Sequence, residues 1–223
     1  KVNTEGQERS LGAFSPNDDG MLESVKPSIA VLRNAERVNY SVYDKDGRKL
    51  VIDLGDDDYL SRTNLGKMSA NGARSSSNGT WDGKVWDPKK GFVVAKDGYY
   101  TYRIKAQLSK DFPAQEYDMK FALDTTGPTI KISDRDENGD VTFTMHDDLI
   151  GTPTAPSITM DGDEGHQLKY DTSQNCKDSE GGHTLTCKIP IDPSAKFIVA
   201  KSFDNALNAN AVAKVFNKLN SAG

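Results

Sequence analysis

The sequence predicts an all-β protein made of two antiparallel β-sandwich domains in series. Apolar and polar residues alternate with a period of two in several segments, and glycine-containing turns separate those segments. Helical patterns are almost absent. The alternation also restarts after Pro128, at "TTGPTIKI", which predicts a boundary between domains 1–126 and 127–223.

The first expected domain opens with a hairpin, "VNYSVY" and "KLVIDL" around the turn "DKDG". A later strand, "YTYRIKAQL", has the same alternation, as expected for a sheet with one face in water. The side chains expected to point inward are Val38, Tyr40, Val42, Leu50, Ile52, Leu54, Tyr100, Tyr102, Ile104, Ala106 and Leu108.

Residues 55–98 are too many for an ordinary hairpin loop. We interpret this stretch as an excursion across the edge of the sandwich, held down by Trp81 and by Trp86. An alternative is that exposed aromatic residues form a binding platform, although alternate tyrosines on one strand usually belong to a core. The platform candidates are Trp81, Trp86, Tyr99, Tyr100 and Tyr102.

The second expected domain begins with "TIKI" and "VTFTM", which flank the turn "SDRDENGD". Further strands are expected at "HTLTCKI" and "KFIVAKSF". The tail "AVAKVFNKL" also fits one face of a helix, but we favour a final strand. The expected core residues are Ile130, Ile132, Val141, Phe143 and Met145.

Composition excludes some functions. The chain has 28 basic and 33 acidic side chains, a net charge of -5, which argues against a nucleic-acid partner. No apolar run is long enough to span a membrane. The chain opens "KVNTEGQERS", without an initiator Met or a signal peptide, and we interpret it as a piece of a longer protein.

Neither a Gly-x-Ser-x-Gly elbow nor a His-Glu-x-x-His helix occurs, so we expect no catalysis by this chain alone.

The stretch "FSPNDDGMLE" concentrates oxygen ligands around Gly20. A calcium ion takes six to eight oxygens and offsets the repulsion between neighbouring carboxylates. The candidate ligands are Asn17, Asp18, Asp19 and Glu23, and the alternative is an acidic turn without an ion.

A second acidic loop, "DRDENGD", resembles the first half of an EF-hand loop. Met145 stands at the position where a bidentate Glu is needed, and Asn-Gly is a strong hairpin signal, so we favour a turn. The weaker cation candidates in this loop are Asp134, Asp136, Asn138 and Asp140.

The two cysteines, Cys176 and Cys187, flank a polar loop. Cys187 alternates with Leu185 and Ile189, so its sulfur is expected to face the core, and Cys176 is expected in a loop that folds back over it. A local disulfide is expected in an extracellular protein, and two free thiols otherwise.

An ordered set of motifs then suggests a family. The chain contains "AFSPNDDGMLESVKP", "VLRNAERVNYSVY", "TWDGKVWD" and "AKDGYYTYRIKA" in this order, over about residues 12–125. This set resembles the fibronectin type III-like domain downstream of the catalytic domain in subtilisin-like cell-envelope serine proteinases of Gram-positive bacteria. The later segments "DTTGPTIKI", "VTFTMHDDLIG" and "FDNALNAN" resemble the immunoglobulin-like modules that follow there.

The resemblance implies a non-catalytic accessory region of a cell-surface serine endopeptidase. Its implied partners are the parent's catalytic domain, protein substrates and host surface proteins, and its implied location is the bacterial cell surface or cell wall. Calcium in the Ser-Pro-Asn loop is implied as well, with Asn17, Asp19 and Glu23 as ligands, although the family often has Asp at the position of Glu23. The alternative is a surface adhesin or carbohydrate-binding module without a protease.

The calcium hypothesis predicts a stability effect confined to calcium-containing buffer. Calcium at a hundredfold excess over its dissociation constant should stabilise the folded protein by about 2.7 kcal/mol. Asp19→Ala should therefore lower the melting temperature in calcium and change it little in chelator. Identical melting curves for the unmodified protein in calcium and in chelator would contradict the hypothesis.

Overall fold

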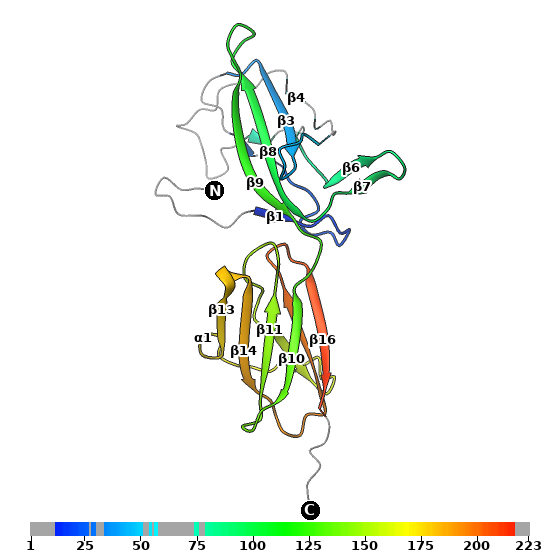
Figure 1. The fold of residues 1–223 in the computed structure, drawn as a ribbon, viewed down its shortest axis with the longest axis vertical. Coiled ribbons are helices and arrows are strands. Elements are labelled where there is room, and N and C mark those ends of the chain that lie inside the picture. Colours follow the sequence, from blue (N-terminus) through cyan, green and yellow to red (C-terminus); the bar gives the residue numbers. More distant parts are fainter. Residues whose placement is uncertain are drawn as a thin grey trace, which may run out of the picture. The chain divides into compact units, whose positions relative to one another are not determined.

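The computed structural model describes residues 12–26, 28–29, 34–50, 54, 56–57, 74–75 and 79–216. About half of these residues lie in strands, which form several mainly antiparallel sheets with almost no helix, and this confirms the all-β prediction (Figure 1). The chain divides into two compact units, unit 1 from Lys1 to Asp124 and unit 2 from Thr125 to Gly223. Within the described ranges, no helix has the length and apolar character needed to cross a membrane.

Unit 1 is organised around a five-stranded sheet with the order β1-β9-β8-β3-β4. Neighbouring strands in it are antiparallel except β1, which pairs in parallel with the end of β9. Two further two-stranded sheets are β2-β5 and β6-β7. The strands are β1 (Gly12–Phe14), β2 (Ser28–Ile29), β3 (Arg37–Tyr43), β4 (Asp56–Asp57), β5 (Arg74–Ser75), β6 (Lys84–Asp87), β7 (Gly91–Val94), β8 (Gly98–Gln107) and β9 (Gln115–Leu123).

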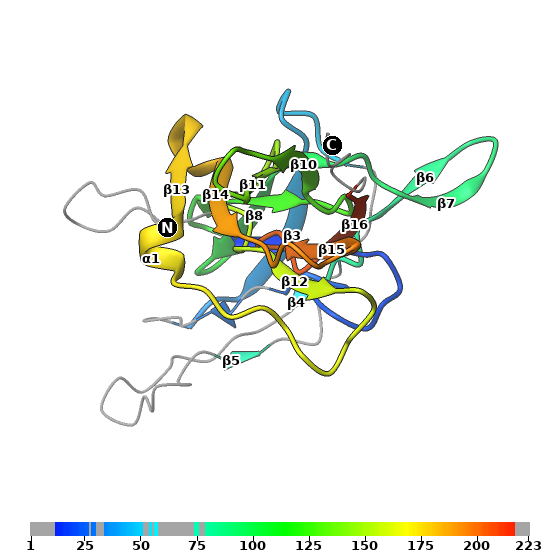
Figure 2. The same cartoon turned by 90° about the horizontal axis from the view of Figure 1, so that it is seen from below.

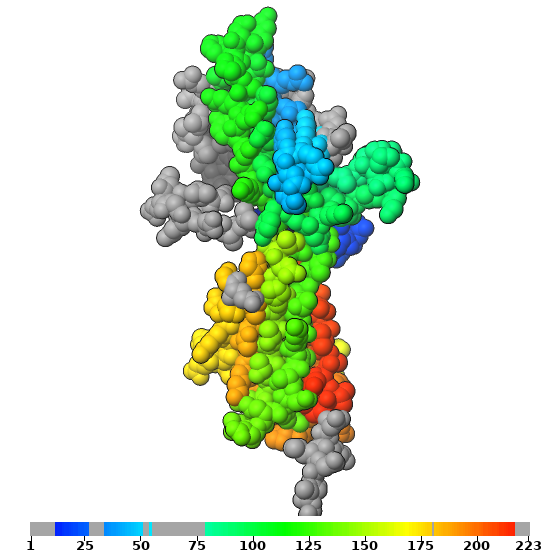
Figure 3. Space-filling view, viewed as in Figure 1, coloured from blue at the N-terminus to red at the C-terminus, as the bar shows by residue number. Residues whose placement is uncertain are grey.

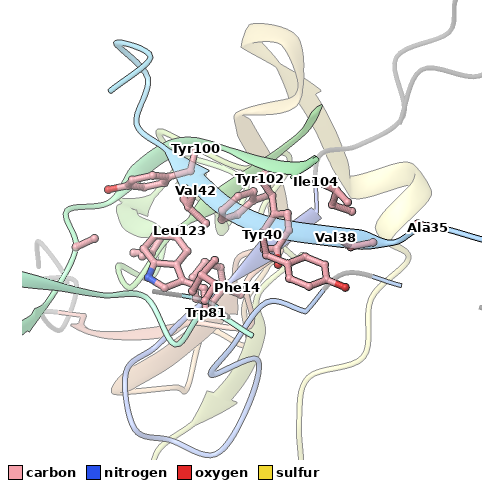
Figure 4. Close-up of a cluster of buried hydrophobic side chains, with 13 residues drawn as sticks. Phe14, Ala35, Val38, Tyr40, Val42, Trp81, Tyr100, Tyr102, Ile104 and Leu123 are labelled. Atoms are coloured by element: carbon pink, nitrogen blue, oxygen red, sulfur yellow. The ribbon is translucent and has the colours of Figure 1, made fainter. Parts of the chain in front are cut away.

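The core of unit 1 lies on the apolar face of this sheet. The predicted inward residues of β3 and β8 are buried, except Ala106, which is partly buried, and they meet across the strand pair (Figure 4). Leu54 is buried and Leu50 is partly buried, whereas Ile52 lies outside the described residues. Leu108 was predicted wrongly. The alternation in the sequence continues past the end of β8, and the prediction followed it. Leu108 lies directly after the last residue of β8 and is 39% exposed.

Trp81 lies at the centre of this core with no exposed surface. Its ring packs on Phe14, Tyr100 and Phe121 at centroid distances of 5.3 to 5.9 Å. Its indole Nε1 donates to the carbonyl oxygen of Lys84 at 2.9 Å. Trp81 therefore holds down the excursion as expected. The same expectation for Trp86 was wrong, because Trp86 is 56% exposed on β6.

A second buried contact fixes the excursion one step earlier. The Tyr102 hydroxyl donates to the carbonyl oxygen of Gly79, and burial raises the pKa of this hydroxyl. Gly79 has a φ of +81°, and a Cβ at this position would lie 2.5 Å from the Tyr102 hydroxyl oxygen. Only glycine therefore allows the backbone to approach the core this closely.

Unit 2 has two sheets, with the strand orders β10-β11-β14-β13 and β12-β15-β16. Figure 2 looks along these strands and shows the two sheets as separate layers. The strands are β10 (Thr129–Arg135), β11 (Asp140–His146), β12 (Ser157–Met160), β13 (Cys176–Ser179), β14 (Thr184–Pro190), β15 (Phe197–Phe203) and β16 (Ala209–Val215), and the one short α-helix among the described residues is α1 (Thr172–Asn175).

The core between these sheets confirms the predicted pattern. Val141, Phe143 and Met145 on β11 are fully buried, Ile130 is 8% exposed, and Ile132 packs on the same cluster. The tail forms strand β16, antiparallel to β15, as favoured over the helix. Its expected helical partner Leu219 lies outside the described residues.

Cys176 and Cys187 are bonded through their sulfurs at 2.09 Å. Cys187 is fully buried. The sequence predicted Cys176 in a loop, and this was wrong. Cys176 begins strand β13 and pairs directly with Cys187 on β14. The bond therefore clamps the edge strand β13 onto its neighbour.

Replacement of both cysteines by alanine should destabilise unit 2 selectively. The bond closes a loop with a sequence separation of 11 residues. In the chain-entropy account such a closure contributes about 2–3 kcal/mol, because it restricts the unfolded chain. Calorimetry of the chain should show the transition of unit 2 at lower temperature and that of unit 1 unchanged. An unchanged transition for unit 2 would show that the disulfide adds no stability.

Candidate functional site

The predicted calcium loop is a hydrogen-bonded turn at the surface of unit 1. The amide of Ser15 donates to the carbonyl oxygen of Leu22 and closes it. Glu23 accepts from the backbone amides of Asp18 and Gly20, and Asp19 accepts from the amide of Met21. The carboxylates of the loop therefore accept hydrogen bonds from the loop's own backbone. This structural role explains much of the concentration of acidic residues there.

The donor set of this loop fits a calcium ion only in part. Carboxylate and amide oxygens are the right chemistry, and Gly20 takes a φ of +84° that allows the sharp turn. However, the carboxylates of this loop do not converge on one point. Among the described residues, the loop does not bring three carboxylate oxygens within 4.8 Å of one another. Asp18 and Glu23 instead line a surface cavity of about 380 Å³ together with Asp82 and Lys84.

The second acidic loop is the turn between β10 and β11. The Asp136 carboxylate accepts from the backbone amides of Asn138 and Asp140. The Lys188 ammonium lies 2.8 Å from Asp136 and 3.5 Å from Asp140, and Lys214 lies 2.7 Å from Asp134. The hydrogen bond from Lys188 lowers the pKa of Asp136. Lysines of unit 2 thus provide the positive charge that a bound cation would otherwise supply.

Sequence reasoning did not single out a pair of buried carboxylates in unit 2. Asp147 follows β11 and Asp204 follows β15, and their side chains bring carboxylate oxygens within 4.8 Å of each other. Asp147 accepts from the amides of Leu149 and Ile150. Asp204 accepts from the amides of Ala206 and Asn208 and from the Asn208 side chain. The signal in the sequence was an Asp directly after an apolar strand in both "HDDLIG" and "FDNALNAN".

Burial dominates the electrostatics of this pair. Asp204 is 2% exposed, and loss of hydration raises the pKa of its carboxyl group, with the nearby Asp147 acting in the same direction. The hydrogen bonds from Asn208 and Ala206 oppose this shift without cancelling it. The charged form of Asp204 is therefore less favourable in the folded unit than in the unfolded chain.

A histidine in the same unit contacts a hydroxyl and a carboxylate. His146 lies 2.7 Å from the Thr184 hydroxyl and 2.9 Å from Asp148 through its two ring nitrogens. Thr184 is 8% exposed and stands directly opposite His146 in the β11–β14 pair. A buried hydroxyl between two strands is closed to a substrate, so we interpret this chain of contacts as cross-strand stabilisation and assign it no catalysis.

The aromatic residues considered as a binding platform separate into two groups. Trp81, Tyr100 and Tyr102 are core residues, whereas Trp86 and Tyr99 are 56% and 40% exposed. Trp86 packs on Phe92 across the β6–β7 hairpin, with ring centroids 5.1 Å apart. A single sequence could not distinguish the buried tryptophan from the exposed one.

Comparisons with known proteins identify relatives of this chain by sequence. The PI-type proteinase of Lactococcus lactis subsp. cremoris is 28% identical over 158 residues, which cover 66% of this chain and 8% of the relative. A C5a peptidase of Streptococcus pyogenes is 31% identical over 149 residues, which cover 66% of this chain and 12% of the relative. The chain is homologous to a segment of these proteinases. This finding confirms the resemblance inferred from the motifs.

These proteinase relatives are far longer than the chain, which spans about a tenth of their length. No protein-family model matches the chain. Among solved structures, murine CEACAM1b covers 88% of the chain at 12% identity, with a TM-score of 0.31. A complex of the mouse coronavirus receptor-binding domain with its murine receptor covers 87% at 11% identity, with a TM-score of 0.33.

The buried acid pair predicts a pH dependence that Asp204→Asn removes. Because the folded pKa of Asp204 is raised, its stabilising contribution is complete below the unfolded value of 3.8 and is lost as the pH rises through the folded value. Relative to the variant, the unmodified chain should gain stability as the pH falls from neutral toward 4. The hydrogen bonds from Asn208 favour the charged form of Asp204, so they reduce this gain but do not reverse it.

Calorimetry of the two proteins over this pH range measures the difference in unfolding free energy. Asp178→Asn is the matched control, because Asp178 is an exposed carboxylate on β13 of the same unit. A difference between the unmodified chain and Asp204→Asn that stays constant with pH, or falls as the pH is lowered, would contradict the assignment.

Proposed function

We propose that this chain is a non-catalytic accessory region of a cell-surface subtilisin-like serine endopeptidase. It spaces or braces the catalytic domain and contributes to the docking of protein substrates. The observation that carries the proposal is the homology to a segment of such proteinases over 66% of the chain. Unit 1 ends at Asp124, so a match of this extent includes residues of both units.

The construction of each unit supports a mechanical role. Unit 1 has its own core around Trp81, and unit 2 has a separate core around Phe143 and Ile198. A module that buries its own core holds its shape whatever the state of its neighbour. Such modules in series can set the distance between a catalytic domain and its anchoring point.

A docking role would act through binding energy remote from the scissile bond. Contacts between a folded substrate and this region would raise kcat/KM for that substrate and leave a short peptide nearly unaffected. The partners on this proposal are the parent's catalytic domain, protein substrates and host surface proteins. The location is extracellular, at the bacterial cell surface or wall, where the Cys176–Cys187 bond would remain oxidised.

We also propose calcium as the ion of the Ser-Pro-Asn loop. Asn17, Asp18, Asp19 and Glu23 would hold it, with exchange of some hydrogen bonds that Asp19 and Glu23 make to backbone amides. The ion would neutralise the loop and fix its conformation, and it has no part in catalysis.

A surface adhesin or carbohydrate-binding module is the second candidate. The observation in its favour is the exposure of Trp86 and Tyr99, because exposed aromatic rings are common in ligand-binding surfaces. An array of purified glycans would test it. Binding to a defined sugar that Trp86→Ala abolishes would favour this candidate over the proteinase region.

Deletion of the region 1–223 from the parent proteinase tests the main proposal. We expect selective loss of kcat/KM for a folded protein substrate, by roughly tenfold, with a short peptide substrate nearly unaffected. Equal loss for both substrates would favour bracing of the catalytic fold over docking. Unchanged activity toward both would leave the spacer role, and hydrolysis by the isolated chain would overturn the assignment.

A further inference from the structure

The β6–β7 hairpin presents an apolar face to solvent. Strand pairing places Trp86 opposite Phe92 and Lys84 opposite Val94, so these four side chains share one face. Trp86, Phe92 and Val94 are 56%, 67% and 41% exposed. The opposite face carries Val85, which packs on the core of unit 1. We call the outer set, Lys84, Trp86, Phe92 and Val94, the aromatic face.

The hairpin stands apart from the main sheet of unit 1. Figures 1 and 2 show β6 and β7 extending away from it, and Figure 3 shows the same segment protruding in the space-filling view. A cross-strand aromatic pair helps such a hairpin to form. That role accounts for contact between the rings but leaves large parts of both rings in water, and exposed apolar patches of this kind mark interaction sites.

The turn of the β6–β7 hairpin carries positive charge, against the net charge of -5 for the whole chain. The turn contains Lys89, Lys90 and one acid, Asp87. At the base of the hairpin, Lys84 lies 3.9 Å from Asp82, and Asp97 follows Lys96 in the sequence. The Asp87 carboxylate accepts from the backbone amides of Lys89 and Lys90 at the turn. Both lysine side chains are exposed, and no carboxylate of the described residues lies within ion-pairing distance of either. An acidic partner would complement this charge.

The shape of the aromatic face favours a polypeptide over a sugar or a lipid. The two rings are inclined at 74°, so they form an angle that suits an apolar side chain and no flat platform for a sugar ring. The turn itself is charged, which disfavours insertion of its tip into a bilayer. The two strands pair only with each other among the described strands, which favours addition of an extended peptide along an outer edge. On β6 such a peptide would pair beyond Lys84, because the amide of Lys84 donates to Asp82 and its carbonyl accepts from the Trp81 indole.

We propose that the aromatic face binds an acidic polypeptide segment with an apolar anchor residue. Trp86 and Phe92 hold the anchor, and Lys89 and Lys90 attract the surrounding carboxylates. The inference deepens the docking role proposed above. It rests on that role at one point, the identification of the bound segment as part of a protein substrate. Binding by the isolated chain is therefore tested separately from activity of the parent.

The experiment measures binding of a labelled peptide to the chain 1–223 by fluorescence anisotropy. The peptide alternates Glu and Gly around a central Leu-Phe pair. Matched peptides replace every Glu by Gln, or the Leu-Phe pair by Ala-Ala. We expect saturable binding of the first peptide only, weakened by salt because exposed charges are screened. The emission of Trp86 should shift to shorter wavelength on binding, whereas the fully buried Trp81 contributes a constant background.

Variants assign the binding to the aromatic face. Trp86→Ala and Phe92→Ala should each raise the dissociation constant by roughly tenfold or more, as for anchor residues of interfaces. Phe112→Ala is the matched control, because Phe112 is 59% exposed in the β8–β9 connection. The double change Lys89→Gln and Lys90→Gln leaves the hairpin backbone intact and should weaken binding by several-fold at low salt, whereas exposed Lys169→Gln with Lys177→Gln should not.

Several results would overturn the proposal. These are no binding of the acidic peptide, equal binding of the Gln peptide, or equal weakening by the control variants. Binding to phosphatidylglycerol vesicles without binding to the peptide would replace the polypeptide by an anionic lipid. If the chain binds the peptide but Trp86→Ala in the parent leaves cleavage of folded substrates unchanged, the aromatic face stands and its link to substrate docking fails.

Discussion

Burial of Trp81 is the contact on which the arrangement of unit 1 depends. The indole joins three parts of the chain that are distant in sequence, because it packs on Phe14 from the first strand, Tyr100 from β8 and Phe121 from β9. Its backbone pairs with Val25, and its Nε1 fixes the carbonyl of Lys84 where β6 begins. The buried indole thus also sets the place from which the exposed hairpin leaves the domain.

Much of the fold could be predicted from alternation alone, because a strand with one dry face must repeat with a period of two. The inward residues of β3, β8 and β11 follow from this rule. The rule fails where the environment changes without a change in pattern, as at Leu108 beyond the strand end. It also cannot separate Trp81 from Trp86, because each lies among similar neighbours and only tertiary packing buries the first.

The candidate sites were less predictable than the fold, because carboxylates perform several tasks in this chain. Asp44, Asp87, Asp136, Asp171 and Asp192 each accept hydrogen bonds from backbone amides two to four residues later. Acidic clusters in the sequence are therefore often turn-forming groups. The buried pair Asp147 and Asp204 also uses such turns, but its proximity arises from strands far apart in sequence, which spacing cannot reveal.

The disulfide at the edge of unit 2 has a consequence for the chain under tension. A protein that tethers one body to another carries load along its backbone, and an unfolded domain lengthens the tether. Cys176 and Cys187 are separated by 11 residues, so the bond removes that stretch from the load-bearing path even when unit 2 has come apart. At roughly 3.5 Å per residue, the oxidised chain would be shorter by about 35 Å than the reduced one after such an event.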